Sequence, residues 1–279
     1  SALSFYEKAY DIEAELTKGK TKSKAMRNDW SLLAESANGR GFVLQYQGQV
    51  DNCFRYHREC LGLSVPLGLD TLTAWALNNI GMAFHRLSEL DSALLYYRKS
   101  LDVRMRMGSQ KMTQSALNNI ARVYQHRGDL DTAEVYLRRV LTINEETRDL
   151  KSMSNTLHSL GANYYQRGQY ARALDFHDRS LRIREQTDDR PGIATSTGEL
   201  SVVYDALGDY GNALKYLRRS LEMITRRGGD GDMATALNNM GLIFTNMNDL
   251  DSARLVYQRS LELFERVGEK DGMALSMAN

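Results

Sequence analysis

The sequence has little of three features that would otherwise direct its interpretation. It contains only two cysteines and two prolines among 279 residues. Two cysteines are too few for a disulfide framework, and the shortage of proline favours helices. No run of about 18 apolar residues occurs, so the sequence predicts no membrane span. The opening residues, SALSFYEKAYDIEAE, lack the charged and then apolar segments of a signal peptide, so we expect a cytoplasmic, all-α protein.

The chain also lacks a large net charge of either sign. The chain has 36 lysines and arginines against 35 aspartates and glutamates, which gives a formal charge of +1. Such an even balance provides no general attraction to nucleic acid or to an anionic membrane. The composition therefore argues against both of these partners.

The sequence does contain a repeat with a period of 40 residues. The string ALNNIG at 76–81 returns as ALNNIA at 116–121 and as ALNNMG at 236–241. The period aligns one small residue in six copies: Gly41, Gly81, Ala121, Gly161, Ser201 and Gly241. A chain-breaking residue follows seven places later in each copy: Gly48, Ser88, Gly128, Gly168, Gly208 and Asn248. A fixed period held over six copies predicts a repeat architecture.

Each copy has the pattern of two helices joined by a tight turn. In the third copy, SALNNIARVYQH places Leu117, Ile120 and Tyr124 on one helical face. Gly128 then supplies a left-handed residue and Asp129 an N-cap for the helix DTAEVYLRRVLTINEE. The second helices have their own column of small residues: Cys60, Ser100, Ser180, Ser220 and Ser260, with Val140 the exception. We expect the small residues to let paired helices approach closely.

These columns, small, aromatic, Gly-Asp turn, alanine, aromatic and small, resemble the tetratricopeptide repeat. The usual repeat has about 34 residues and a proline that closes its second helix. This chain lacks that proline and is similar to the longer 40-residue branch, which includes kinesin light chains, spindle-orientation scaffolds and bacterial sensor or effector arrays. The resemblance implies an α-solenoid, a right-handed superhelix of antiparallel helix pairs. It says much less about function, because function depends on the site and not on the scaffold.

The period also divides the chain into parts. Residues 1–30 would hold the second helix of a truncated repeat and a lysine-rich linker, and residues 271–279 the start of another truncated repeat. Between them, 31–270 would form an array of six units: 31–70, 71–110, 111–150, 151–190, 191–230 and 231–270. Because both ends fall inside a repeat, we expect a fragment of a longer protein.

The asparagine pairs are candidates for ligand binding. The first helices of such a solenoid line its concave groove, and an amide that donates and accepts can hold the backbone of an extended peptide. The repeated pairs are Asn78, Asn79, Asn118, Asn119, Asn238 and Asn239. A packing role remains open for the second member of each pair, which could instead bond a neighbouring helix.

The fourth and fifth units lack the pair, and we expect partner specificity to depend on that break. His158 and Glu199 replace asparagine there. Further residues on the same helical faces complete the predicted surface: Trp75, Met82, His85, Arg122, Gln125, Tyr165 and Asp205. Trp75 and Tyr165 are the candidate aromatic anchors, since aromatic residues dominate many interfaces. Trp75 could equally be a packing residue.

Other patterns do not predict chemistry. AELTKGKT at 14–21 is similar to a phosphate-binding loop but follows a helix instead of a strand, so we expect no nucleotide. Cys53 and Cys60 stand in small-residue columns, where they should pack as apolar groups. The five histidines show no pairing at three or four residues, the spacing of a metal site on a helix. We therefore expect no cofactor, no metal and no catalytic residue.

Basic residues form a column on the second helices: Lys99, Arg139, Arg179, Arg219 and Arg259. We interpret it as a solvated outer face, while contact with RNA, an acidic protein or a second copy of the chain stays open. The lysine-rich stretch at 17–27 is interpreted in the same two ways, as a solvated loop or as a docking loop for an acidic partner.

Three functions are consistent with these observations. The first is a non-enzymatic scaffold that binds a peptide or helix of another protein in its groove. The second is a sensor or regulatory arm of a larger signalling or effector protein. The third is a module for self-association through uncapped ends.

Overall fold

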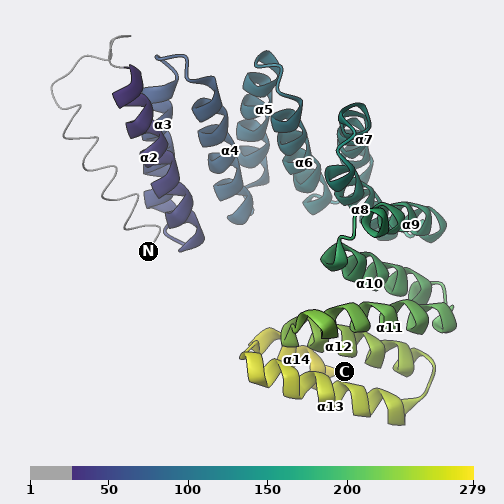
Figure 1. The fold of residues 1–279 in the computed structure, drawn as a ribbon. Helices are drawn as coiled ribbons and strands as arrows, with labels where there is room; N and C mark the ends of the chain where they lie inside the picture. The colour runs from purple at the N-terminus through teal and green to yellow at the C-terminus, as the bar shows by residue number, and fades with distance from the viewer. Residues whose placement is uncertain (1–26) are drawn as a thin grey trace. The chain divides into compact units, whose positions relative to one another are not determined.

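The computed structural model describes residues 27–279, which form thirteen α-helices and contain no strand (Figure 1). The helices are α2 (Arg27–Tyr46), α3 (Val50–Ser64), α4 (Asp70–Arg86), α5 (Leu90–Arg106), α6 (Gln110–His126), α7 (Leu130–Thr147), α8 (Leu150–Gln166), α9 (Tyr170–Gln186), α10 (Arg190–Ala206), α11 (Tyr210–Arg227), α12 (Asp230–Asn246), α13 (Leu250–Val267) and α14 (Lys270–Ala278). The predicted all-α fold is confirmed. The expected helix near the N-terminus, most of the lysine-rich stretch and the string at 14–21 lie outside the described residues.

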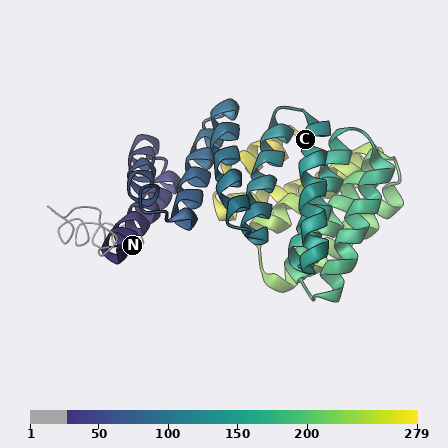
Figure 2. The same cartoon turned by 90° about the horizontal axis from the view of Figure 1, so that it is seen from above.

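The helices form two compact units that divide within α7, between Ile143 and Asn144. Inside each unit, consecutive helices lie side by side, as both views show (Figure 1 and Figure 2). The helices pack most extensively in pairs, among them α4 with α5 and α12 with α13. Stacked helix pairs are the architecture of an α-solenoid. Within residues 27–279, no helix is both long enough and apolar enough to cross a bilayer.

Every turn between the described repeat helices contains a residue with left-handed backbone. The chain-breaking column predicted from the sequence has positive φ angles in all six copies, from 60° at Ser88 to 76° at Gly128. A second column shares this conformation at the end of each second helix: Gly68, Gly108, Arg148, Asp188, Gly228 and Gly268. Glycine adopts this conformation without strain. These two columns therefore fix where each helix ends.

The small-residue column of the first helices is explained by its partner sixteen residues later. A Cβ built on Gly81 would come within 2.7 Å of the ring of Tyr97, and one on Gly241 within 2.5 Å of Tyr257. Histidine fills the same place beside Gly41 and Gly161, at His57 and His177. Where the small residue is alanine or serine, the partner is leucine: Leu137 after Ala121 and Leu217 after Ser201. The helices can thus approach closely only because one side of the contact lacks a bulky side chain.

The serine column of the second helices holds four of the pairs together in a different way. Oγ of Ser100 donates to the backbone oxygen of Ala74 over 2.8 Å. The same bond recurs, 26 residues apart, from Ser180, Ser220 and Ser260 over 2.7–2.8 Å. Each hydroxyl is buried or nearly so, and a buried polar group is stable only with such a partner.

The predicted core stripe of the third repeat is confirmed. Leu117 and Ile120 are fully buried and pack with Leu94 and Tyr97 of α5. Tyr124 lies at the edge of this cluster and stacks on Tyr136, with ring centroids 5.6 Å apart. The polar side chains of these helices therefore remain for other contacts.

Candidate binding surfaces

The asparagine pairs form hydrogen bonds between consecutive repeats. Nδ2 of Asn119 donates to Oδ1 of Asn78 over 2.8 Å. Nδ2 of Asn79 donates to Oδ1 of Asn38 over 3.1 Å. In both bonds the donor follows the acceptor by 41 residues, so the second asparagine of one repeat reaches the first position of the repeat before it. The structure thus shows Asn79 and Asn119 hydrogen-bonded to the preceding repeat, which is the packing role left open for them above.

A third bond of this kind lies at the end of the described chain, where Nδ2 of Asn279 donates to Oδ1 of Asn238 over 3.3 Å. Two of the first members of the pairs are well buried, with Asn78 at 8 % exposure and Asn238 at 2 %. Asn118 is exposed, and Asn239 is half-buried beside a pocket on α10, α11 and α12. The use of these amides to hold a peptide backbone therefore stays a prediction. Asn118 and Asn239 are the two members of the pairs that a peptide could reach.

The deeper residues of the predicted surface differ in their contacts, and Asp205 makes one between repeats. Oδ1 of Asp205 accepts a hydrogen bond from Nδ2 of Asn246 over 3.0 Å, again 41 residues away. The ring of Tyr165 packs beside that of Tyr170, with centroids 5.5 Å apart. Trp75 is 42 % exposed on α4, which leaves part of its ring available to a partner.

His158 is not placed as a free groove residue. Its ring centroid lies 5.5 Å from that of His177. Burial lowers the pKa of His158 to about 4, and the positive charge of Arg184 contributes in the same direction. This imidazole is therefore neutral near pH 7. Gln125, by contrast, is half-exposed on α6.

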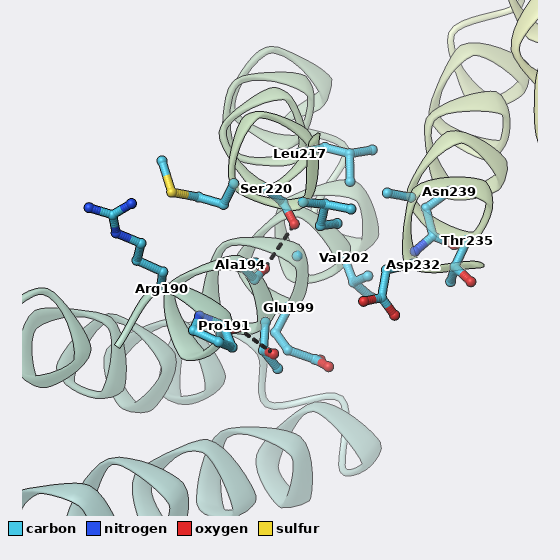
Figure 3. A pocket seen from close by; sticks show the side chains of 15 residues that line it. Arg190, Pro191, Ala194, Glu199, Val202, Leu217, Ser220, Asp232, Thr235 and Asn239 are labelled. Atoms are coloured by element: carbon cyan, nitrogen blue, oxygen red, sulfur yellow. Dashed lines mark hydrogen bonds between the residues drawn. The ribbon is translucent and has the colours of Figure 1, made fainter. Parts of the chain in front are cut away.

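In the second unit, a pocket of about 570 Å³ opens between α10, α11 and α12 (Figure 3). Its apolar wall includes Pro191, Val202, Leu217, Met223 and Ile224. Its polar residues include Arg190, Glu199, Asp232, Thr235 and Asn239. Figure 3 shows Asp232, Thr235 and Asn239 on one helix, across the pocket from Glu199 and Val202 on another. Pockets of this size and composition are typical of ligand sites.

This pocket exists because two positions of the repeat lack the polar side chains present in several other copies. Gly198 stands in the column that elsewhere holds asparagine or histidine. Ile224 stands in the column of Arg104 and Arg184, which tie their helix to the following one by donating to the backbone oxygens of Met112 and Gly192 over 2.7 and 2.9 Å. An isoleucine cannot make that bond. The space between α10 and α12 therefore stays open.

Charge at the pocket is set by Glu199 and its neighbours. Burial raises the pKa of the Glu199 carboxyl, while the nearby Arg184 guanidinium lowers it. Arg184 is almost fully buried and is occupied by hydrogen bonds to Gly192, Ser196 and Asn155. The edge of the pocket carries two carboxylates and the Arg190 guanidinium, which pairs with Asp188 over 3.5 Å. With an apolar wall and the two carboxylates, the pocket can hold an apolar side chain that lies next to a cationic one.

A second hollow, of about 290 Å³, lies in the first unit. It brings together three residues of the predicted surface, Met82, His85 and Arg122. Nε2 of His85 lies 2.9 Å from Nδ1 of His126, so the two imidazoles share one hydrogen bond. This histidine pair was not predicted, because the spacing of residues within a single helix does not reveal it. The 41-residue offset between the two histidines was the available signal.

The remaining candidate groups show no arrangement for metal or redox chemistry. Across residues 27–279, three or more histidines, cysteines, aspartates or glutamates never converge as metal ligands. Cys53 and Cys60 are free thiols that pack fully buried, as the small-residue columns predicted. Burial raises the pKa of the Cys60 thiol to about 12.

Three members of the basic column of the second helices lie over aromatic rings, and the other two, Arg219 and Arg259, form ion pairs. Lys99 is 5.3 Å from the ring centroid of Tyr96, and Arg179 is 5.4 Å from that of Phe176. Arg139 lies 6.0 Å from Tyr136. Such cation–π contacts at exposed positions contribute about 0.5–1 kcal/mol. They give the column a local structural role whether or not it also binds a partner.

Comparison with known proteins supports the repeat assignment. A family model described as "Tetratricopeptide repeat" matches residues 32–106, 112–186, 152–226 and 192–266. No curated protein matches the chain in sequence.

Solved structures of similar fold include the following three. The crystal structure of BtubC (BKLC) from P. vanneervenii is 18 % identical, with a TM-score of 0.71 over 82 % of this chain and 91 % of that one. A Rap protein complexed with Competence and Sporulation Factor is 14 % identical, with a TM-score of 0.62 over 99 % of this chain and 84 % of that one. A signal-transduction ATPase (STAND) protein with a tetratricopeptide repeat sensor, from Pyrococcus horikoshii, is 12 % identical, with a TM-score of 0.74 over 97 % of this chain and 42 % of that one.

Proposed function

Because the chain belongs to the tetratricopeptide repeat family, we propose that it is a non-catalytic scaffold that binds a segment of another protein, with the pocket on α10, α11 and α12 as its anchor site. The observation that carries this proposal is the pocket itself, which opens where the repeat pattern loses two polar side chains. Tetratricopeptide arrays expose such surfaces for partners. The similar Rap protein, which is complexed with Competence and Sporulation Factor, supports a binding role.

The lining of the pocket specifies the chemistry of the partner. Leu217, Met223 and Ile224 would contact an apolar side chain of the bound segment. Burying a leucine-sized side chain contributes about 1.5–3 kcal/mol. Glu199 and Asp232 would favour a lysine or arginine beside that anchor. The partner segment would therefore contain an apolar residue next to a basic one.

We also propose a separate binding face in the first unit, formed by the accessible residues of the predicted surface there. Asn118 and Gln125 on α6 could extend contact within the first unit, together with Trp75 on α4. The buried members of the asparagine pairs hold the repeats in register and so keep this face in place. We further propose a cytoplasmic location, in keeping with two free, buried thiols.

A library of displayed random peptides tests the proposal although the partner is unidentified. The library is selected on the wild-type chain and on Gly198→Leu, which would fill the pocket. A Cβ on Gly198 meets only Oγ of Ser220, at 3.7 Å, so the backbone can accept a side chain here. Gly62→Leu on the exposed face of α3 is the matched control.

We expect peptides with an apolar residue next to lysine or arginine to bind the wild type and Gly62→Leu but not Gly198→Leu. Glu199→Lys should shift the selected charge from basic to acidic. Selection of the same peptides by all the variants would remove the pocket from the binding site.

A second candidate function is the sensor arm of a larger signalling protein. The specific observation is the likeness to a STAND protein with a tetratricopeptide repeat sensor, of which this chain spans 42 %. The sequence of the gene on either side of residues 1–279 distinguishes the two candidates, because an adjoining catalytic domain would favour the sensor arm. Self-association, the third possibility, would appear as a concentration-dependent mass in sedimentation.

A further inference from the structure

The hollow in the first unit has an unusual balance of charge. Its lining includes Arg86, Arg122, His85 and His126, and no aspartate or glutamate. Arg122 donates to the neutral amide oxygen of Asn119 over 2.9 Å. Arg86 lies over a tyrosine ring, and neither guanidinium forms an ion pair with another described residue. Two full positive charges therefore face this hollow without a counter-ion.

Gln45 lies at the inner side of the same hollow. Its side chain is 2 % exposed, and neither its amide nitrogen nor its amide oxygen has a hydrogen-bond partner among the described residues. Leaving such a group buried and unpaired costs about 1–3 kcal/mol. The hydroxyl of Tyr97, which is fully buried, lies beside Arg122 and also lines the hollow. The Tyr97 hydroxyl lies within hydrogen-bond reach of Arg122, whereas the Gln45 amide has no partner, so Gln45 is the polar group left to contact a ligand.

The electrostatic surroundings favour an anion in that space. The positive charge of Arg122 helps to lower the pKa of His85 to about 4, after burial and the neighbouring His126. The C-terminal ends of α2, α4 and α6 oppose this with about half a negative charge each. Some carbonyl oxygens at those helix ends accept hydrogen bonds within the following turn, such as that of Tyr124 from the backbone N–H of Asp129 over 3.0 Å. Two guanidinium charges outweigh what remains.

We propose that this hollow is a binding site for an oxyanion, either a phosphoryl group or a carboxylate. Arg86 and Arg122 would supply charge-assisted hydrogen bonds, which are the strongest available to such groups. The amide of Gln45 would complete the inner contacts. The site uses none of the residues of the pocket on α10, α11 and α12, so it stands or falls independently of the proposed function.

Calorimetric titration of the full chain at low ionic strength tests this site, with inorganic phosphate and acetate as the probes. We expect one of them to bind, and Arg86→Gln and Arg122→Gln to weaken that binding about tenfold each. Gln45→Leu should weaken it by a smaller factor. Arg139→Gln, which removes an exposed arginine of a second helix, is the matched control and should change the affinity less than about twofold. The probe that binds more tightly identifies the anion as phosphoryl or carboxylate.

Circular dichroism of each variant shows whether it folds, and Arg86→Gln keeps the test valid if loss of the Arg122 bond to Asn119 disturbs packing. The proposal is overturned if neither probe binds the wild type, or if Arg139→Gln weakens binding as much as Arg86→Gln. It is also overturned if Zn²⁺ binds instead and His85→Ala or His126→Ala abolishes that binding.

Discussion

The imidazole of His177 lies against the backbone of Gly161, where a Cβ on that glycine would come within 2.6 Å of Cε1. Both residues are buried, and His177 is fully so. The contact shows why the two columns vary together along the chain. A small residue on the first helix is a requirement set by the size of its partner on the second.

Replacing this glycine tests that requirement. We expect Gly161→Ala to reduce the free energy of unfolding by about 1–3 kcal/mol, because the added methyl group overlaps the imidazole. The double variant Gly161→Ala with His177→Leu should recover most of the loss, since Ala121 and Leu137 occupy these positions in another repeat. Urea denaturation of the wild type, the two single variants and the double variant gives the coupling between the two sites. Equal losses in the single and double variants would contradict the size argument.

The hydrogen bond between Asn119 and Asn78 should contribute measurably to stability. Asn119→Ala leaves the oxygen of a well-buried amide without its donor, so we expect a loss of about 1–3 kcal/mol. Asn118→Ala, one residue away and exposed, is the control and should change stability by less than about 0.5 kcal/mol. Thermal and urea unfolding of the two variants measure the difference. Similar values for both would mean that the bond between repeats adds nothing.

His57 makes stability depend on pH. Burial lowers the pKa of His57 to about 4, below the value of about 6.5 for an unfolded histidine. The unfolded chain therefore binds this proton first as the pH falls. The stabilisation is complete above about pH 6.5 and is lost between about 6.5 and 4, with a contribution of about 3 kcal/mol.

The variant His57→Gln removes this titration while keeping a donor for Oδ1 of Asn38, which accepts from His57 over 3.1 Å. We expect the free energy of unfolding of the wild type to fall more steeply between about pH 7 and pH 4.5 than that of the variant. His85, His158 and His177, whose pKa values are lowered in the same way, keep a residual slope in both proteins. Parallel curves would show that His57 titrates normally.

The left-handed turns offer a stabilising substitution. Ser88 has a φ of 60° at a position where four other repeats have glycine. A non-glycine residue in this conformation costs about 1 kcal/mol. We therefore expect Ser88→Gly to raise the free energy of unfolding by an amount of that order. Gly128→Ala, at the matching turn with open space around it, should lower it by a similar amount in the same denaturation experiment.

The fold could be predicted from the sequence because its rules are local and repeated. The breaker column places the turn within each repeat, and the spacing of Leu117 and Ile120 identifies the buried face. The asparagine contacts could not be predicted in the same way. A helical wheel shows that Asn78 and Asn79 are adjacent on a surface, but not that one would donate to Asn38 and the other accept from Asn119. That depends on how far consecutive first helices are offset, which only the packed structure supplies.

The candidate sites, too, were visible in the sequence only where they depend on residues within one repeat. The break at Gly198 and Glu199 was visible in the sequence, and both residues line the pocket on α10, α11 and α12. The role of Ile224 was not, because the arginine contact that it replaces links two repeats. The hollow with Gln45 depends on three first helices and a tyrosine of α5, so no single repeat contains its pattern.

The serine and asparagine bonds connect different parts of the repeat, and this difference determines how the number of repeats can change. Each serine bond closes within one helix pair, and each asparagine bond connects a pair to the one before it. Duplication or deletion of a segment that encodes one whole repeat would therefore leave both kinds of bond intact at the new junction. An insertion of any other length would change the 41-residue spacing of the asparagine bond that spans it, whereas later donors and acceptors would shift together. The array can thus gain or lose whole repeats, while the length of each repeat stays constrained.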